Sequence, residues 1–211
     1  MGEFVKNIAV FASGRGSNFK KIFHSIKEGK IPARVCCLIT DNSKAGAIEF
    51  AKENDIPVYT IPPKQYHTSE DFGKALLEVL NNYNIEWIVL AGYLKKIPDI
   101  VVEKYANRIL NIHPALLPAF GGKGMYGMHV HEAVFVSGAK VSGVTVHLVN
   151  NEYDRGPIVM QRPVDIESCR SPEEIASTVL KVEHQLYSEA LKKIFTTDFQ
   201  VIGNRVIFNK K

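Results

Sequence analysis

The sequence predicts an α/β fold with one mixed, mainly parallel sheet and helices on both of its faces. Three observations indicate this. Short apolar runs alternate with segments whose apolar residues recur at helical spacing, which is typical of β-α-β units. The first apolar run ends in a glycine-rich loop that leads directly into such a helix. Two later runs, 141–149 and 158–165, are joined by a link too short for a parallel crossover, so we expect them to pair antiparallel.

The N-terminal half is predicted to repeat strand and helix. Gly29 and Pro32 end the first helix, because glycine and proline interrupt helical spacing. The later strands are short, apolar and bounded by turn residues. The expected elements are, in order, a strand over 7–12, a helix containing Phe19, Ile22, Phe23 and Ile26, a strand over 33–40, a helix over 45–54, a strand at 57–59, a helix containing Phe72, Leu76, Val79, Leu80 and Tyr83, and strands over 86–91 and 108–112.

The C-terminal half follows a different pattern. After the antiparallel pair, Ser171-Pro172 opens a long amphipathic helix. Its apolar face is expected to contain Ile175, Val179, Val182, Leu186 and Ile194. The final segment, FQVI-GN-RVIF, predicts a hairpin with a two-residue turn.

Length and composition limit the classes of protein to consider. With 211 residues and no linker, the chain is expected to form one domain, with halves of about 1–100 and 101–211. It is 45% hydrophobic and 23% charged, and we expect neither a signal peptide nor a membrane span. Cys36 and Cys37 are adjacent on a strand and point to opposite faces, which argues against a disulfide framework and for the cytoplasm. The net charge of +4 is modest and the lysines and arginines are scattered along the chain, which favours a small anionic ligand over nucleic acid.

The loop Ser13-Gly-Arg-Gly-Ser-Asn18 joins the first strand to its helix. Glycines there allow a close backbone approach, and the N–H groups of the helix start attract an anion, so a phosphate site is predicted. The loop is not a Walker motif, and Phe19 replaces the third glycine of a dinucleotide fingerprint. The alternative is a simple turn capped by Ser17 or Asn18.

Asn111 and His113 lie at the end of a predicted strand, where alternation puts both on one face while Ile112 enters the core. An amide and an imidazole side by side can hydrogen-bond a carbonyl oxygen and manage a proton near neutral pH. This pair therefore suggests acyl-transfer chemistry. The alternative is structural, with Asn111 satisfying loop backbone and His113 capping a neighbouring group.

Asp154 lies in a turn-forming segment, NNEYDRGP, where it could serve only to form the turn. The other histidines are weaker candidates for catalysis, because His129 and His131 flank a helix start and His147 lies within a strand. Their spacings match no compact zinc signature, so no metal is predicted, although a His129/His131 site is conceivable.

Taken together, these residues resemble the glycinamide ribonucleotide formyltransferase family. The resemblance runs from about residue 7 to the long C-terminal helix. It rests on six ordered motifs: Ser13-Gly-x-Gly-Ser-Asn18, LAGYLKKIP at 90–98, NIHPALLPAF at 111–120, HEAV at 131–134, SGVTVH at 142–147, and Asp154-x-Gly-Pro157.

The resemblance implies a formyltransferase fold with a Rossmann-like N-terminal half. It implies direct transfer of the formyl group of 10-formyltetrahydrofolate to the glycine amine of N1-(5-phosphoribosyl)glycinamide, in purine synthesis. It further implies no metal, no nucleic acid or membrane partner, and a monomer or homodimer.

The resemblance also assigns roles to individual residues. Asn111 and His113 would hold the formyl oxygen, with His113 as the proton donor, and Asp154 would raise the pKa of its imidazole. The remaining positions are Gly16, Ser17 and Asn18 for the phosphate, Glu183 for a ribose hydroxyl, and Leu90, Leu94, Lys95, Lys96, Ile97 and Asn111 for the folate.

This sequence departs from the family pattern at three places. The loop 119–130 is longer than the short Pro-Gly-x-His link common in the family. Ser69 stands where many members carry an arginine near the folate tail, so the tail's glutamate would be held by Lys64, by Lys74 or by neither. Leu180 replaces a polar residue, so Glu183 would act without that partner.

Three rival functions remain. The catalytic domain of methionyl-tRNA formyltransferase would need a further C-terminal domain and a basic surface. Formyltetrahydrofolate hydrolase would use water in place of the amine and usually carries an N-terminal regulatory domain. A non-catalytic phosphate-binding module would leave Asn111, His113 and Asp154 without a joint role.

Overall fold

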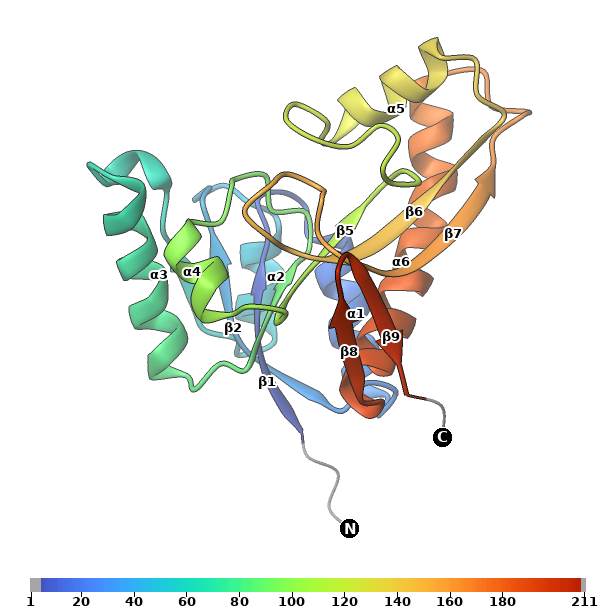
Figure 1. Ribbon diagram of the computed structural model, residues 1–211. Helices are drawn as coiled ribbons and strands as arrows, with labels where there is room; N and C mark the ends of the chain where they lie inside the picture. Colours follow the sequence, from blue (N-terminus) through green and yellow to red (C-terminus); the bar gives the residue numbers. More distant parts are fainter. Residues whose placement is uncertain (1–4, 210–211) are drawn as a thin grey trace. The chain divides into compact units, whose positions relative to one another are not determined.

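The structure is a computed structural model that describes residues 5–209. It divides into two compact units, Met1–Leu110 and Asn111–Lys211. Figure 1 shows the elements of each unit. That the two halves work as one domain stays a prediction.

The first unit is built from β-α-β repeats. Its strands follow the order β3-β2-β1-β4, and β1 pairs parallel with both β2 and β4. Its elements are β1 (Lys6–Phe11), α1 (Ser17–Lys27), β2 (Ala33–Thr40), α2 (Ala47–Glu53), β3 (Val58–Thr60), the 3-10 helix η1 (Pro63–Gln65), α3 (Ser69–Asn82), β4 (Trp87–Leu90) and α4 (Asp99–Lys104).

The strand order of the first unit places helices on both faces of its sheet. The chain moves outward from β1 to β2 and β3, then returns past β1 to β4. Because such crossovers are right-handed, reversing direction puts the connecting helices on opposite faces. In agreement, α1 packs against α2 and α3 packs against α4 (Figure 1). The carboxyl ends of β1 and β4 therefore carry exposed loops where ligands of open α/β sheets bind.

The second unit contains antiparallel pairs. β6 and β7 pair antiparallel, as do β8 and β9, whereas β7 and β9 are parallel. Helix α6 packs along β6 and β7, and α5 packs against α6 (Figure 1). Its elements are the end of β5 (Ile109–His113), α5 (Met128–Val136), β6 (Val141–Leu148), β7 (Ile158–Asp165), α6 (Pro172–Thr196), β8 (Phe199–Ile202) and β9 (Arg205–Phe208).

Helix α6 shows why its sequence is helical. The Ser171 hydroxyl accepts a hydrogen bond from Glu174 N, and Pro172 occupies the first turn, where no N–H is required. The buried face includes Ile175, Val179, Leu186 and Ile194 as predicted. Val182 is only half-buried, while the neighbouring Glu183 is buried.

The predicted mixed α/β fold is confirmed, and most strands begin and end within a residue or two of the expected positions. Helix α4 was not predicted, because its 6 residues are too few to show a helical period. The C-terminal hairpin is confirmed, with Gly203 at a φ of 57°. All three cysteines are unpaired.

Within residues 5–209, no helix is both long and apolar enough to cross a membrane.

Candidate active site

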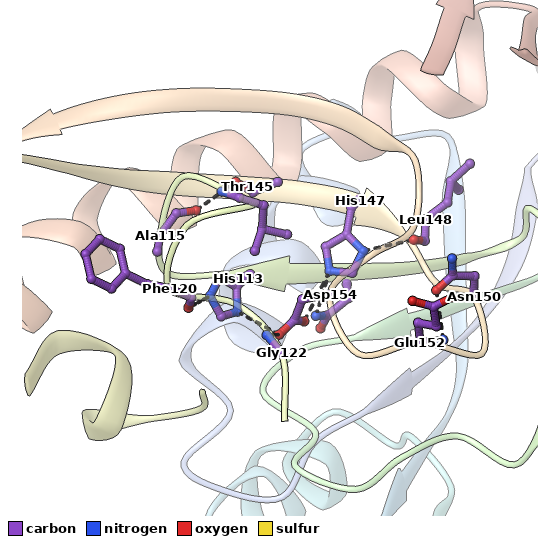
Figure 2. Close-up of polar contacts among 12 residues, drawn as sticks. His113, Ala115, Phe120, Gly122, Thr145, His147, Leu148, Asn150, Glu152 and Asp154 are labelled. Atoms are coloured by element: carbon purple, nitrogen blue, oxygen red, sulfur yellow. Dashed lines mark hydrogen bonds and ion pairs between the residues drawn. The ribbon is translucent and has the colours of Figure 1, made fainter. Parts of the chain in front are cut away.

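The second unit brings Asn111, His113 and Asp154 together. Figure 2 shows His113 and Asp154 with the neighbouring His147. Asn111 and His113 are alternate residues near the end of β5, so their side chains share a face, while the buried Ile112 lies on the other. Asp154 reaches the same place from the turn between β6 and β7. The three side chains therefore converge from segments about 40 residues apart.

His113 is held by an acceptor near each of its ring nitrogens. Nε2 donates to the Phe120 carbonyl at 2.8 Å, because a carbonyl oxygen can only accept. Nδ1 lies 3.6 Å from Asp154 Oδ2. Only 3% of His113 is exposed, so these two acceptors and not bulk solvent surround its ring nitrogens. The imidazole therefore has one fixed orientation.

Asp154 is fixed by the backbone around it. Its Oδ2 accepts from Gly122 N at 2.9 Å, and its own backbone has a φ of 55°, a left-handed conformation that aspartate tolerates better than most residues. Close packing supports the turn, since a Cβ at Gly156 would lie 1.8 Å from the Leu148 carbonyl oxygen. The turn that the sequence suggested thus also orients the Asp154 carboxylate toward His113 and His147.

His147 is a fourth member of the cluster, which the sequence did not predict. Its Nδ1 lies 2.9 Å from the Leu148 carbonyl and so carries the hydrogen. In the neutral ring Nε2 then accepts from Asn111 Nδ2 at 3.1 Å, and the same atom is 3.6 Å from Asp154 Oδ1. His147 therefore orients the Asn111 amide. The available signal was the alternation in SGVTVH, which puts Thr145 and His147 on one strand face.

Burial and charge act against each other in this cluster. Burial lowers the pKa of His113 below its ordinary value and outweighs the opposing effects of Asp154 and the Phe120 carbonyl, while His147 lowers it further. Asp154 thus acts in the predicted direction without raising the net pKa of His113 above 6.5. For Asp154, burial raises the carboxyl pKa, but His147, His113 and Gly122 N–H outweigh it, and the net pKa is lowered.

This arrangement can stabilise negative charge on a carbonyl oxygen. Asn111 Nδ2 and His113 Nε2 are both donors on one strand face, and a carboxylate behind the imidazole favours its charged form. The same imidazole can deliver a proton. These are the capacities needed for transfer of an acyl group through a tetrahedral intermediate.

In the first unit, the glycine loop opens α1 without a side-chain cap. Gly16 is the N-cap residue at φ 72°, and a Cβ there would lie 2.7 Å from Ala47 Cβ. The alternative in which Ser17 or Asn18 caps the helix is therefore wrong. Ser17 and Asn18 form the first turn, where helical N–H groups lack partners within the helix. The uncapped N–H groups at the start of α1 are the feature expected of an anion site.

A cleft of about 480 Å³ lies beside the same loop. Ser13 Oγ links its parts: it donates to Asp41 Oδ1 at 2.5 Å and accepts from Leu94 N at 3.0 Å. Among the predicted folate residues, Leu94 and Lys95 line this cleft and Leu90, Lys96 and Ile97 do not. The full lining is Ser13, Asp41, Asn42, Pro62, Pro63, Lys64, Leu94 and Lys95.

The other predicted residues are placed as follows. Leu90 and Ile97 are buried, and Lys96 Nζ pairs with Asp99 at 2.9 Å. Glu183 is 9% exposed on α6. His129 and His131 both lie inside α5, which begins at Met128, and do not flank its start. Across the described part of the chain, no three or more His, Cys, Asp or Glu side chains are grouped to hold a metal ion.

Fold and cluster together define an α/β protein equipped for acyl-group transfer, and comparison with protein families identifies the class. The formyl transferase family model matches residues 6–191, and the chain belongs to this family.

The names of individual relatives are more specific than the description of the family. A chloroplastic phosphoribosylglycinamide formyltransferase of Arabidopsis thaliana is 47% identical over 90% of this chain, which spans 65% of that protein's length, less than two thirds. The phosphoribosylglycinamide formyltransferase of Bacillus subtilis is 38% identical over 90% of this chain and 95% of its own. The crystal structure of glycinamide ribonucleotide transformylase 1 from Symbiobacterium toebii matches with a TM-score of 0.92 and 33% identity, covering 100% of this chain and 96% of that one.

Proposed function

We propose that this chain transfers the formyl group of 10-formyltetrahydrofolate to the glycine amine of N1-(5-phosphoribosyl)glycinamide, a step of purine synthesis. The observation that carries the proposal is the convergence of Asn111, His113 and Asp154 in the second unit. The names of the relatives indicate the acceptor, and the folate donor is the one that the resemblance of the sequence motifs implies.

In this proposal the folate supplies a formyl carbon, and the chain's residues stabilise the charge that amine attack creates. Asn111 Nδ2 and His113 Nε2 donate to the oxygen as it becomes an oxyanion. Asp154 keeps the imidazole oriented and favours its charged form. One C–N bond forms to the glycine amine, and the C–N bond to the folate breaks. The proton that the amine loses balances the one that the folate nitrogen gains, with His113 as the relay.

The remaining residues complete the binding assignment. Gly16, Ser17 and Asn18 receive the phosphate at the uncapped start of α1. Glu183 binds a ribose hydroxyl, and Leu94 and Lys95 contact the folate with Leu90, Lys96, Ile97 and Asn111. The proposed reaction needs no metal, because side chains supply both the donors and the proton.

The partners and the compartment stay predictions. We expect a monomer or homodimer that acts on small molecules and not on nucleic acid or membranes. The cytoplasm is the compartment that the sequence predicts, whereas the Arabidopsis relative is named as chloroplastic.

Release of tetrahydrofolate from 10-formyltetrahydrofolate tests the proposal, measured with and without glycinamide ribonucleotide. We expect release that requires the amine and that falls about a hundredfold or more in His113→Ala, since a donor to the oxyanion is lost. The exposed His67→Ala serves as the matched control and should keep full activity. Release without the amine would favour the hydrolase, and no release in either case would exclude both.

A further inference from the structure

The turn that follows His113 is held by two side chains of the β6–β7 pair. Thr145 on β6 and Gln161 on β7 are directly opposite each other in the antiparallel register, so their side chains lie on the same face. Both side chains reach the backbone of residues 115–117, and Figure 2 shows Thr145 beside Ala115. Neither residue belongs to the catalytic cluster described above.

The directions of these hydrogen bonds follow from the groups involved. Thr145 Oγ1 lies 2.7 Å from the Ala115 carbonyl oxygen, which can only accept, so the hydroxyl hydrogen points there. The same Oγ1 then accepts from Leu117 N at 3.0 Å and from Gln161 Nε2 at 3.0 Å. Gln161 Nε2 carries two hydrogens and donates the second to the Leu117 carbonyl at 2.9 Å. Gln161 is therefore a donor to both of its partners.

The Leu117 carbonyl ties Gln161 to the turn. Leu117 is 6% exposed, and its oxygen accepts from Gln161 Nε2. Leaving a buried carbonyl without a donor is unfavourable, so the Gln161 side chain and the turn stay together. Gln161 as a whole is exposed, and its importance shows only in the contacts of its amide.

The segment that these side chains hold lies between the two ends of a contact of the imidazole. His113 Nε2 donates to the Phe120 carbonyl, which is 7 residues further along the chain. Residues 115–117 lie between them, and Ala119 N closes the turn onto the Leu116 carbonyl at 3.1 Å. The Phe120 carbonyl stays beside the imidazole only while this stretch keeps its shape. A side chain on β7 thus acts on the imidazole through the backbone.

We infer that Gln161 is a positioning residue for His113: together with Thr145 it holds residues 115–117, and thereby the Phe120 carbonyl and the imidazole, in place. The inference rests on the proposed function, in which His113 is the oxyanion donor and the proton relay. Because Gln161 acts through the turn, its loss should slow the chemical step without weakening substrate binding.

The contact between His113 and Phe120 can be followed by NMR without turnover, in the full chain with isotope-labelled histidine. A ring N–H that is buried and hydrogen-bonded exchanges slowly with water and gives a resolved signal, which His113→Ala assigns. Gln161→Met keeps the length of the side chain and removes both donors. We expect it to shift or broaden the His113 signal while the other histidine signals stay in place. Gln200→Met, which changes an exposed glutamine of β8, should leave all of them unchanged.

Thr145 offers a conservative pair of variants for the same measurement. Thr145→Ser keeps the hydroxyl and should keep the His113 signal. Thr145→Val removes the hydroxyl with little change of shape and should act like Gln161→Met. The double variant of Gln161→Met and Thr145→Val should change the signal little more than either single variant, because both remove the same support of the turn.

Formyl transfer to glycinamide ribonucleotide gives the second readout. We expect Gln161→Met to lower kcat about tenfold, because small displacements of a catalytic group slow the reaction, while KM rises for neither substrate. Gln200→Met should keep both constants. An unchanged His113 signal or an unchanged kcat in Gln161→Met, or an equal effect of Gln200→Met, would overturn the inference. If the signal moves as expected in a chain that transfers no formyl groups, the positioning stands and the proposed function fails.

Discussion

Asp154 lies between two imidazoles, at 3.6 Å from a nitrogen of each, and accepts a backbone N–H as well. The two rings have different tasks in this geometry. His113 offers a donor on the strand face shared with Asn111, whereas His147 fixes the Asn111 amide. One carboxylate thus orients both donors of the proposed oxyanion site.

Removing the Asp154 charge should change how His113 titrates. Burial already lowers the pKa of His113, and Asp154 is the largest opposing influence. In Asp154→Asn the pKa of His113 should fall further, so less imidazolium is present at neutral pH. We expect the pH profile of kcat to move to lower pH, with neutral activity lost by about tenfold for each unit of that displacement.

Glu152→Gln is the control for this variant, because it removes an exposed carboxylate from the same turn. Its pH profile should match that of the unchanged chain. A profile of Asp154→Asn that moved to higher pH would contradict the role assigned to Asp154.

At the scale of elements, the conformation of the glycine loop depends on one of its glycines, Gly16, more than on its glycine content. Gly16 needs a left-handed backbone and has Ala47 against it, whereas Gly14 has φ outside that region and open space where a Cβ would point. The two glycines are two positions apart, but only one is required by the structure of the turn.

Gly16→Ala should therefore strain the start of α1. We expect the free energy of unfolding to fall by about 1–3 kcal/mol, because the added Cβ meets Ala47 and the residue sits at positive φ. The KM for glycinamide ribonucleotide should rise, since the N–H groups of the first turn move. Urea unfolding and steady-state kinetics measure both effects.

Gly14→Ala should leave both quantities near those of the unchanged chain. If the two variants behaved alike, the turn geometry would not be what shapes the phosphate site.

Elements were predictable from sequence to the extent that their signals are local. The strands β2 and β7 have the bounds that the sequence predicted, and Ser171-Pro172 marks the start of α6. α4 is too short for a period to show. His147 was missed because its place beside Asp154 depends on how the chain returns between β6 and β7, and the spacing of 7 residues does not reveal that return. Asn111 and His113 were found because strand alternation is itself local.

At the scale of the whole molecule, buried imidazoles make stability depend on pH. Burial lowers the pKa of His131 from 6.5 to about 4, with a smaller contribution from His113. The unfolded chain therefore takes up a proton at higher pH than the folded chain does. The contribution of neutral His131 to the free energy of unfolding is fully present above about pH 6.5 and is lost as the pH drops toward 4.

The free energy of unfolding should thus decrease between pH 6.5 and 4, by up to about 3 kcal/mol for His131 alone. Urea unfolding at a series of pH values measures the slope. His131→Gln should reduce the slope, because the group no longer titrates. His67→Gln, which removes an exposed imidazole, should not alter it. A slope unchanged in His131→Gln would show that other groups govern acid unfolding.

The Phe120 carbonyl occupies the donor atom of His113 that the proposed reaction uses. An acceptor joined to the same chain cannot diffuse away, so a formyl oxygen would meet it as a tethered competitor at high effective concentration. Loop 119–130 would thereby lower the apparent affinity for substrate through its contact with His113. The contact that orients the imidazole is thus also the contact that a formyl oxygen would have to replace in the proposed reaction.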